Sequence, residues 1–161
     1  MGKPILQYKK SELYDRVVDE YDVFGSSYEF MVFLAVLGYR EGNAKRSDYT
    51  GNRDNGTKGE IALQNLYSNE FIRVVMSSLA FQDTGKPEAL VDQKTQMTTL
   101  AQFAAGGLEI AEQAFGDTAG DPTDAILNHV KTHHEPAEYQ GTLGEIVDAF
   151  DEQLLDGSGQ E

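Results

Sequence analysis

The segment YEFMVFLAVLGY, residues 28–39, is apolar on every side of the helix that its composition favours. A helix of that kind is normally buried at the centre of a bundle, because none of its faces suits water. Ser26 before it and Glu29 in its first turn have the spacing of a capping box, in which each side chain accepts a hydrogen bond from a free backbone N–H. We therefore expect the helix from Tyr28 to Tyr39 to organise the core.

Helical periodicity continues on both sides of this segment. Ser11 can cap a helix with one apolar face formed by Leu13, Val17, Val18 and Tyr21. Residues 60–81 fit one or two helices with a break near Ser68–Asn69. The core residues expected there are Ile61, Leu66, Phe71, Ile72, Val75, Met76 and Leu79.

A longer amphipathic helix is expected from Met97 to Phe115, and it contains the adjacent glycines Gly106 and Gly107. Each glycine inside a helix costs roughly 1 kcal/mol relative to alanine. Two together predict either the close approach of another backbone or a kink, and close packing is the simpler interpretation.

The C-terminal third contains two more helical patterns. Asp121 and Pro122 are typical of a helix start, and that helix should end before Pro136. A last helix is expected from Thr142, with one apolar face made by Leu143, Ile146, Val147, Phe150 and Leu154.

These patterns predict an all-α fold, a single compact bundle of about six helices, with room for a short strand at Pro4–Tyr8. At 161 residues one domain is the simplest organisation. We place it at residues 1–155, followed by a disordered acidic tail at residues 156–161.

The composition excludes several classes of protein. Without cysteine there is no disulfide, no thiolate nucleophile and no cysteine-ligated zinc or iron–sulfur site. No stretch approaches the roughly 18 apolar residues of a membrane span, and the N-terminal MGKPILQYKK lacks the apolar core of a secretory signal. We expect a cytoplasmic protein.

The formal net charge of −14 is unevenly distributed. Residues 1–60 contain 9 Lys and Arg against 10 Asp and Glu, a net −1, whereas residues 61–161 contain 4 against 17, a net −13. Three interpretations are open: a halophile-like surface of solvated carboxylates, ordinary acidity, and mimicry of nucleic acid. The first is favoured and mimicry is the least favoured.

No motif in the sequence supports catalysis or a cofactor. The glycine-rich TGNRDNGTKGE lacks the Lys-Ser/Thr ending of a Walker loop, and the G-x-S-x-G pattern of serine hydrolases is absent. His129 and His133 have the i, i+4 spacing of metal ligands, but no third ligand follows from the sequence. Histidines in a last helical turn also interact favourably with free carbonyl groups. We therefore predict a protein without enzymatic activity, cofactor or bound metal.

A basic loop, residues 39–58, stands out in this acidic chain. It contains Tyr39, Arg40, Lys45, Arg46, Tyr49, Arg53 and Lys58. Arginine forks and aromatic rings suit phosphates and bases, so these seven residues form the candidate partner- or phosphate-binding site. The alternative is a solvated connector whose cations meet carboxylates of the acidic remainder, within the chain or across a subunit interface.

Several blocks occur in a characteristic order: YDVFGSSYEFMVFLAVLGYR, the basic loop, EIALQNL, FIRVVMSSLAFQDTGKPEAL and LAQFAAGGLEIAEQAF. In these the chain resembles the DNA phosphorothioation (Dnd) system-associated protein 4 family over roughly residues 22–130. QFAAGGLEI matches the family's aromatic-Ala-x-Gly-Gly-Leu run. The resemblance implies an accessory role beside proteins that place sulfur in the DNA backbone and use that mark in antiviral defence. It brings no catalytic residue with it.

Two functions fit this resemblance. One is an adaptor that docks larger restriction or modification proteins; the other is a small DNA-contacting module that uses the basic loop on phosphates. Five phosphate contacts would give a log–log salt slope of roughly −4.5, so such a loop could not hold DNA in a halophile's cytoplasm. We therefore expect the adaptor, with DNA contacted only inside a larger assembly, and the oligomeric state stays open.

Overall fold

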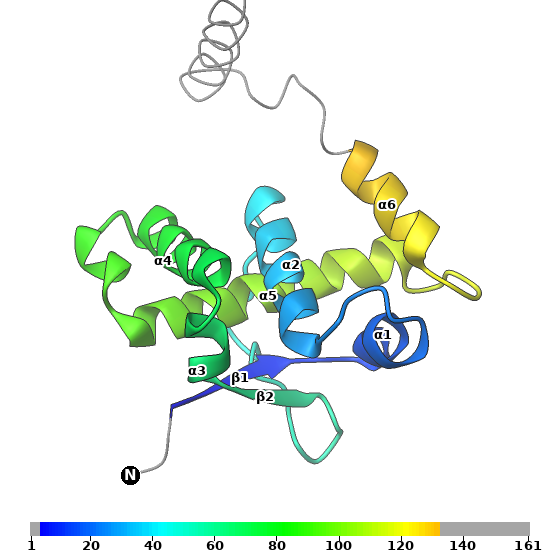
Figure 1. Cartoon of the computed structure of the whole chain (residues 1–161), viewed down its shortest axis with the longest axis horizontal. Helices are drawn as coiled ribbons and strands as arrows, with labels where there is room; N and C mark the ends of the chain where they lie inside the picture. Colours follow the sequence, from blue (N-terminus) through cyan, green and yellow to red (C-terminus); the bar gives the residue numbers. More distant parts are fainter. Residues whose placement is uncertain (1–3, 133–161) are drawn as a thin grey trace, which may run out of the picture. The chain divides into compact units, whose positions relative to one another are not determined.

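The structure is a computed structural model, and it describes residues 4–132. Its elements follow the chain in this order (Figure 1): β1 (Ile5–Lys9), α1 (Glu12–Tyr14), the π-helix η1 (Asp15–Glu20), α2 (Ser27–Arg40), β2 (Lys58–Ala62), α3 (Leu63–Tyr67), α4 (Glu70–Thr84), the 3-10 helix η2 (Pro87–Leu90), α5 (Gln93–Phe115) and α6 (Thr123–Thr132). Six α-helices over these residues confirm the predominantly helical fold. The helix expected from Thr142 and the acidic tail at residues 156–161 lie outside the described residues.

The chain divides between Thr123 and Asp124 into two units. The first contains every element from β1 to α5. The helix start expected at Asp121–Pro122 is confirmed, because α6 begins at Thr123 and the Asp121 carboxylate accepts a 2.9 Å hydrogen bond from the Thr123 N–H. The single domain expected over residues 1–155 stays a prediction.

Helix α2 begins with the expected capping box. Ser26 Oγ accepts a 3.3 Å hydrogen bond from the Glu29 N–H, and Glu29 Oε2 accepts a 3.1 Å bond from the N–H of Gly25. The helix lies across α5 (Figure 1) and buries seven residues: Phe30, Met31, Val32, Leu34, Ala35, Leu37 and Gly38. It is not buried all round, since Val36 and Tyr39 are each 41% exposed. One stripe of this central helix therefore reaches the surface.

The glycine pair of α5 allows two segments to approach its backbone closely. A Cβ at Gly107 would lie 1.8 Å from the carbonyl oxygen of Leu34 in α2. A Cβ at Gly106 would lie 1.7 Å from the carbonyl oxygen of Asn43 in the basic loop. No side chain fits at such distances, so the prediction of close backbone packing at Gly106–Gly107 is confirmed.

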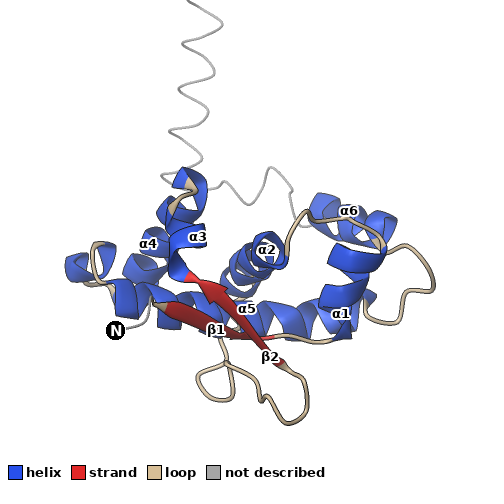
Figure 2. Ribbon diagram, turned by 60° about the horizontal axis from the view of Figure 1, so that its bottom comes forward, coloured by secondary structure: helices blue, strands red, loops and turns tan. Residues whose placement is uncertain are grey.

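The strand expected at Pro4–Tyr8 is present as β1, and it pairs antiparallel with β2 (Figure 2). Leu6 and Tyr8 of β1 are buried, whereas Ile5 is half exposed, as the period-two geometry of a strand requires. The sequence does not predict the second strand, because the apolar pattern of residues 60–62 fits the start of a helix equally well. Gly59 of β2 leaves room for the Tyr8 ring, which lies 2.3 Å from where a Cβ would stand.

The expected helix break at Ser68–Asn69 separates α3 from α4, and Asn69 Oδ1 accepts a 3.1 Å hydrogen bond from the Ile72 N–H at the start of α4. The inner face of α4 is formed by Ile72, Met76, Leu79 and Ala80. Phe71 was expected in the core, and this is wrong: its side chain is 72% exposed. It stands one residue, or about 100°, away from the buried stripe.

Candidate functional site

The basic loop is fixed along α5 instead of extending freely into solvent. The Asn43 side-chain amide donates a 2.9 Å hydrogen bond to the carbonyl of Gly106, and the Lys45 N–H donates a 3.0 Å bond to the carbonyl of Gln102. Because Gly106 has no side chain, the loop backbone can reach the helix backbone at this point. The first part of the loop is therefore a strap across α5.

Arg46 has the most complete set of contacts in the basic loop. Its guanidinium forms two hydrogen bonds to the Asp83 carboxylate, at 2.6 and 3.0 Å, and a third to Gln102 Oε1 at 2.6 Å. It also lies 5.7 Å from the centre of the Phe103 ring, against which Tyr39 packs edge-on at 5.6 Å. The hydrogen bond to Asp83 raises the pKa of Arg46. Arg46 thus joins the loop to α4 and α5.

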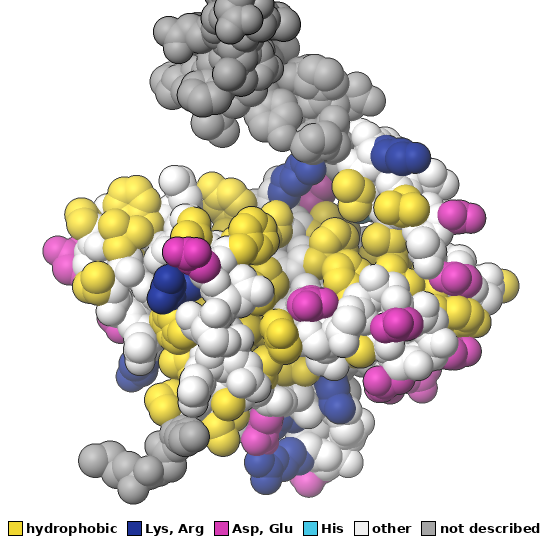
Figure 3. All heavy atoms as spheres, viewed as in Figure 1, with side chains coloured by type: hydrophobic (Ala, Val, Ile, Leu, Met, Phe, Trp, Pro, Cys, Tyr) yellow, Lys and Arg dark blue, Asp and Glu magenta, His cyan; other side chains and the backbone are white. Residues whose placement is uncertain are grey.

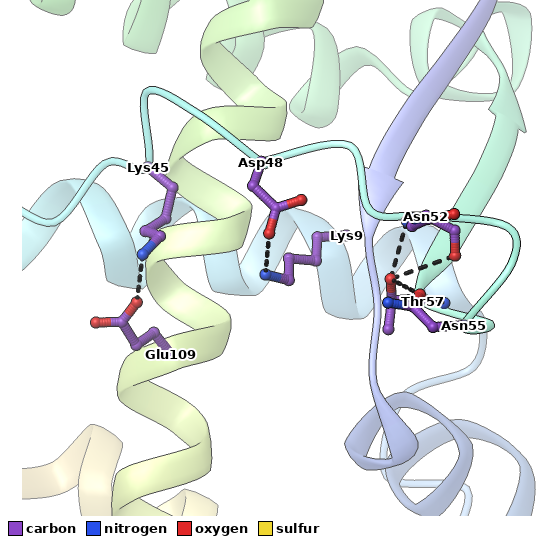
Figure 4. A network of polar contacts seen from close by, with 7 residues as sticks. All are labelled: Lys9, Lys45, Asp48, Asn52, Asn55, Thr57 and Glu109. Carbon is purple, nitrogen blue, oxygen red and sulfur yellow. Dashed lines mark hydrogen bonds and ion pairs between the residues drawn. The ribbon is translucent and has the colours of Figure 1, made fainter.

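Lys45 and Arg53 also meet carboxylates of the same chain. Lys45 Nζ lies 3.0 Å from Glu109 Oε2 on α5, as Figure 4 shows. Arg53 pairs with Glu60 of β2, and this hydrogen bond raises the pKa of Arg53. These pairs are open to solvent, since the Lys45 side chain is 39% exposed and that of Arg53 73%.

The tip of the loop is held by polar contacts at its own base (Figure 4). Thr57 Oγ1 donates to Asn55 Oδ1 at 2.6 Å and accepts a 2.9 Å hydrogen bond from the Asn52 N–H. Next to this turn, Lys9 of β1 forms a 3.0 Å ion pair with Asp48, whose φ of 53° is unusual for a residue other than glycine. The loop is therefore held by contacts among its own residues and by Lys9 of β1.

The remaining candidate residues lie on different parts of the molecule. Lys58 Nζ is 3.5 Å from Gln7 Oε1 across the two-stranded sheet. Arg40 is exposed in the last turn of α2, and Tyr49 lines a small hollow between β1 and α5. The seven candidates are thus spread over several elements, and Lys45, Arg46 and Arg53 pair with carboxylates. This arrangement is what the connector alternative predicts; the assignment of the loop as a binding site stays a prediction.

Of the three histidines in the chain, the structure describes one. His129 lies in the last turn of α6, while His133 and His134 lie outside the described part. Between residues 4 and 132 no cluster of three or more His, Cys, Asp or Glu side chains is arranged to hold a metal ion. The prediction that the protein works without metal stays a prediction.

An apolar groove between α2 and α4 is the site that the sequence analysis did not identify. It encloses about 450 Å³ and is lined by Phe24, Glu29, Val32, Phe33, Val36, Asn69, Phe71 and Ile72. Its α2 wall is a continuous stripe at positions i, i+3, i+4 and i+7, from Glu29 to Val36. Figure 3 shows hydrophobic side chains gathered over α4 and α2 on this face. We name this site the α2–α4 groove.

Phe24 reaches the groove through an irregular turn. The π-helix η1 ends in a reversal in which the N–H groups of Val23 and Phe24 both donate to the Val17 carbonyl, at 2.7 and 3.2 Å. Asp22, with a φ of 50°, takes the left-handed conformation that this reversal needs. The Phe24 ring then packs 5.2 Å from that of Phe33. Local backbone strain thus positions one wall of the groove.

The two polar residues in the lining cap helices. Glu29 accepts the Gly25 N–H at the start of α2, and Asn69 accepts the Ile72 N–H at the start of α4. The groove therefore offers few oriented hydrogen-bonding groups, which small-molecule sites use to fix their ligands. What it can do is bury apolar side chains.

No helix of the described part is both long enough and apolar enough to cross a membrane. Neither curated proteins nor solved structures gave a significant match to the chain. The sequence profile of the DNA sulphur modification system-associated protein 4 family matches residues 8–146, which extends beyond the resemblance at both ends. Since this match covers well over half of the sequence, the chain belongs to the family of DNA sulphur modification system-associated protein 4.

Proposed function

We propose that this protein is a non-catalytic adaptor of a DNA phosphorothioation-linked defence system, which docks a larger restriction or modification protein through the α2–α4 groove. The observation that carries the proposal is the groove itself. Phe71 lines the groove and is 72% exposed, Val36 lines it and is 41% exposed, and Phe24 and Phe33 complete the apolar lining. Scattered exposed apolar residues are normal on protein surfaces, whereas a contiguous set around a groove is typical of a protein–protein contact.

The chemistry of the groove supports binding in preference to catalysis. Its lining contains no histidine, serine or lysine, and its one carboxylate, Glu29, is engaged in the capping box. General acid–base or nucleophilic catalysis needs a titratable group that can reach a substrate. An adaptor needs only apolar complementarity and a rigid wall, which α2 supplies through its packing on α5.

The DNA-contacting alternative has weaker support in the geometry. Lys45, Arg46 and Arg53 each lie against a carboxylate of the same chain. A phosphate would have to displace or share these partners, so each contact would release less free energy than an unpaired cation gives. The basic loop is better suited to holding α4, α5 and the sheet together.

The experiment is pairwise co-expression of this chain with each larger protein encoded in the same system, followed by size-exclusion chromatography. The proposal expects one stable complex that Phe71→Ser abolishes. Val91→Ser is the matched control, since Val91 is 83% exposed and lies outside the groove lining. Failure to form any complex, or equal behaviour of the two variants, would contradict the proposal.

A further inference from the structure

We infer that the occupant of the α2–α4 groove is a basic amphipathic α-helix presented by the partner protein. This inference rests on the proposed function, because it assumes that the groove is the docking surface. It adds the secondary structure and the charge of the segment that docks.

The geometry of the two walls favours a helix. On α2, Glu29, Val32, Phe33 and Val36 follow one another at helical spacing along a single stripe. On α4, Phe71 and Ile72 line the groove beside Asn69, and the Phe71 side chain is 72% exposed. The apolar stripe of α2 and the start of α4 at Phe71 and Ile72 form the two sides of an open groove. A third helix can complete such a surface in a bundle, by ridges packed into grooves.

The size and polarity of the groove agree with this occupant. A groove of about 450 Å³ takes several aliphatic side chains, as presented by positions i, i+3 or i+4, and i+7 of one helix. A strand would need free backbone groups to pair with, but the walls are helices whose backbone groups are used internally. A helix satisfies its own backbone groups and can bury side chains alone.

The charge around the groove selects a basic partner. Glu29 lines the groove, and no Lys or Arg is among its lining residues. Glu70 precedes Phe71, its side chain is 89% exposed, and its nearest approach to Arg73 is a loose 3.9 Å. The whole chain carries a net charge of −14, which attracts cationic segments and repels acidic ones. Lysines or arginines flanking the apolar face of the partner helix would meet the exposed Glu70 first, since Glu29 already accepts the Gly25 N–H.

The same charge argument disfavours two other occupants. A second copy of this chain would bring another −14 charge to the interface. The chain's own segment 142–155 has the sequence pattern of an amphipathic helix but contains four carboxylates and no Lys or Arg: Glu145, Asp148, Asp151 and Glu152. A second copy remains a distinguishable outcome of the test, as a dimer in solution.

The test measures fluorescence anisotropy of synthetic peptides with the full-length protein at physiological salt. The first probe has leucines at i, i+3, i+4 and i+7 and lysines on its polar face. The second has the same leucines with glutamates in place of lysines, and the third has the composition of the first in scrambled order. We expect the first to bind at least about tenfold more tightly than either of the others.

Groove variants separate specific docking from general attraction between opposite charges. Phe71→Ser and Val36→Ser should each weaken binding of the first peptide by about tenfold, while Val91→Ser should leave it unchanged. Unchanged melting temperatures establish that the variants fold, since all three side chains are exposed. Equal binding of the scrambled peptide, or groove variants that bind as well as wild type, would overturn the inference.

Two further outcomes separate this inference from the proposed function. If Phe71→Ser abolishes the complex with a system protein but no helical peptide binds, the helix inference falls and the adaptor function stands. If the isolated protein is a dimer that Phe71→Ser converts to monomer, the groove is covered by a second copy and both proposals fall.

Discussion

The guanidinium of Arg46 donates two hydrogen bonds to the carboxylate of Asp83, at 2.6 and 3.0 Å. Arg46 belongs to the basic loop and Asp83 to the last turns of α4, 37 residues further along the chain. The Asp83 side chain is 17% exposed, so this pair is better shielded from water than the other loop pairs. Paired hydrogen bonds in a shielded site are the arrangement in which an ion pair contributes measurably to stability.

Arg46→Ala should therefore lower the free energy of unfolding by about 0.5–1 kcal/mol, limited by the 56% exposure of the arginine side chain. Arg53→Ala is the matched control and should melt as wild type does, because its pair with Glu60 is open to solvent. Urea denaturation of both variants provides the measurement. A double-mutant cycle of Arg46→Ala and Asp83→Ala with no coupling energy would contradict this assignment.

Gly107→Ala should destabilise the protein, although alanine favours a helix by roughly 1 kcal/mol. The new methyl group would lie 1.8 Å from the Leu34 carbonyl oxygen, so α2 and α5 must move apart. Overpacking of this kind costs about 1–3 kcal/mol. Gly25→Ala is the control, because its Cβ would lie 3.2 Å from a Glu29 oxygen at the end of a flexible side chain. Thermal unfolding that shows Gly107→Ala at or above wild type would exclude close packing as the reason for this glycine.

Acidification should destabilise the fold partly through Asp92, the cap of α5. The Thr95 hydroxyl and the N–H groups of Thr95 and Lys94 donate to its carboxylate, which lowers its pKa. A lowered carboxyl pKa gives stability that is present above the unfolded value, near 3.9, and is lost as the pH falls through the folded value. Asp92→Ala should therefore melt below wild type at pH 7, and this difference in melting temperature should shrink as the pH falls below the unfolded value. If wild type and Asp92→Ala differ in melting temperature by the same amount at pH 7 and in acid, the charge of Asp92 does not contribute to stability.

Added salt should stabilise the protein. The net charge of −13 over residues 61–161 produces repulsion between carboxylates, which counter-ions screen. Salt also weakens the ion pairs of the basic loop, but those are few compared with the excess of carboxylates. The melting temperature should rise between about 0.1 and 2 M KCl. A flat or falling curve would count against the halophile-like interpretation of the surface.

The features that were predictable from the sequence are local ones. The capping box of Ser26 and Glu29, the helix break before Glu70 and the glycine pair all depend on residues within a few positions of one another. The apolar pattern of α2 predicts where the helix lies in the sequence, but not which of its apolar side chains are exposed. The sequence pattern of an apolar stripe is the same whether the stripe is buried or exposed. The exposure of Val36 could therefore not be told from the burial of Leu34.

What could not be predicted depends on contacts between distant segments. The pair of Arg46 and Asp83, and that of Lys45 and Glu109, require the loop path that Gly106 allows. β2 was missed because a strand of five residues is defined by its partner β1 more than by its own sequence. The α2–α4 groove depends on how two helices are placed, which the sequence does not show. The one sequence feature that indicates an exposed Phe71 is that it lies outside the stripe formed by Ile72, Met76 and Leu79.

The last prediction concerns DNA and the basic loop. If the loop cations are held by carboxylates of the chain, wild-type protein alone should not shift duplex DNA at physiological salt. Neutralising the partners in the triple variant Glu60→Gln, Asp83→Asn, Glu109→Gln would release Arg53, Arg46 and Lys45 from their ion pairs. That variant should gain weak DNA binding that decreases steeply with salt.

A control with the same change in charge is available, because Glu88, Glu112 and Asp117 are exposed carboxylates outside these pairs. The triple variant Glu88→Gln, Glu112→Gln, Asp117→Asn should bind DNA no better than wild type if the position of the released cations matters. Equal gains in the two triple variants would show that total charge alone controls DNA binding. If wild-type protein itself binds duplex DNA with a log–log salt slope of about −4 to −5, the DNA-contacting alternative is correct, and the pairs seen in the loop yield to phosphate.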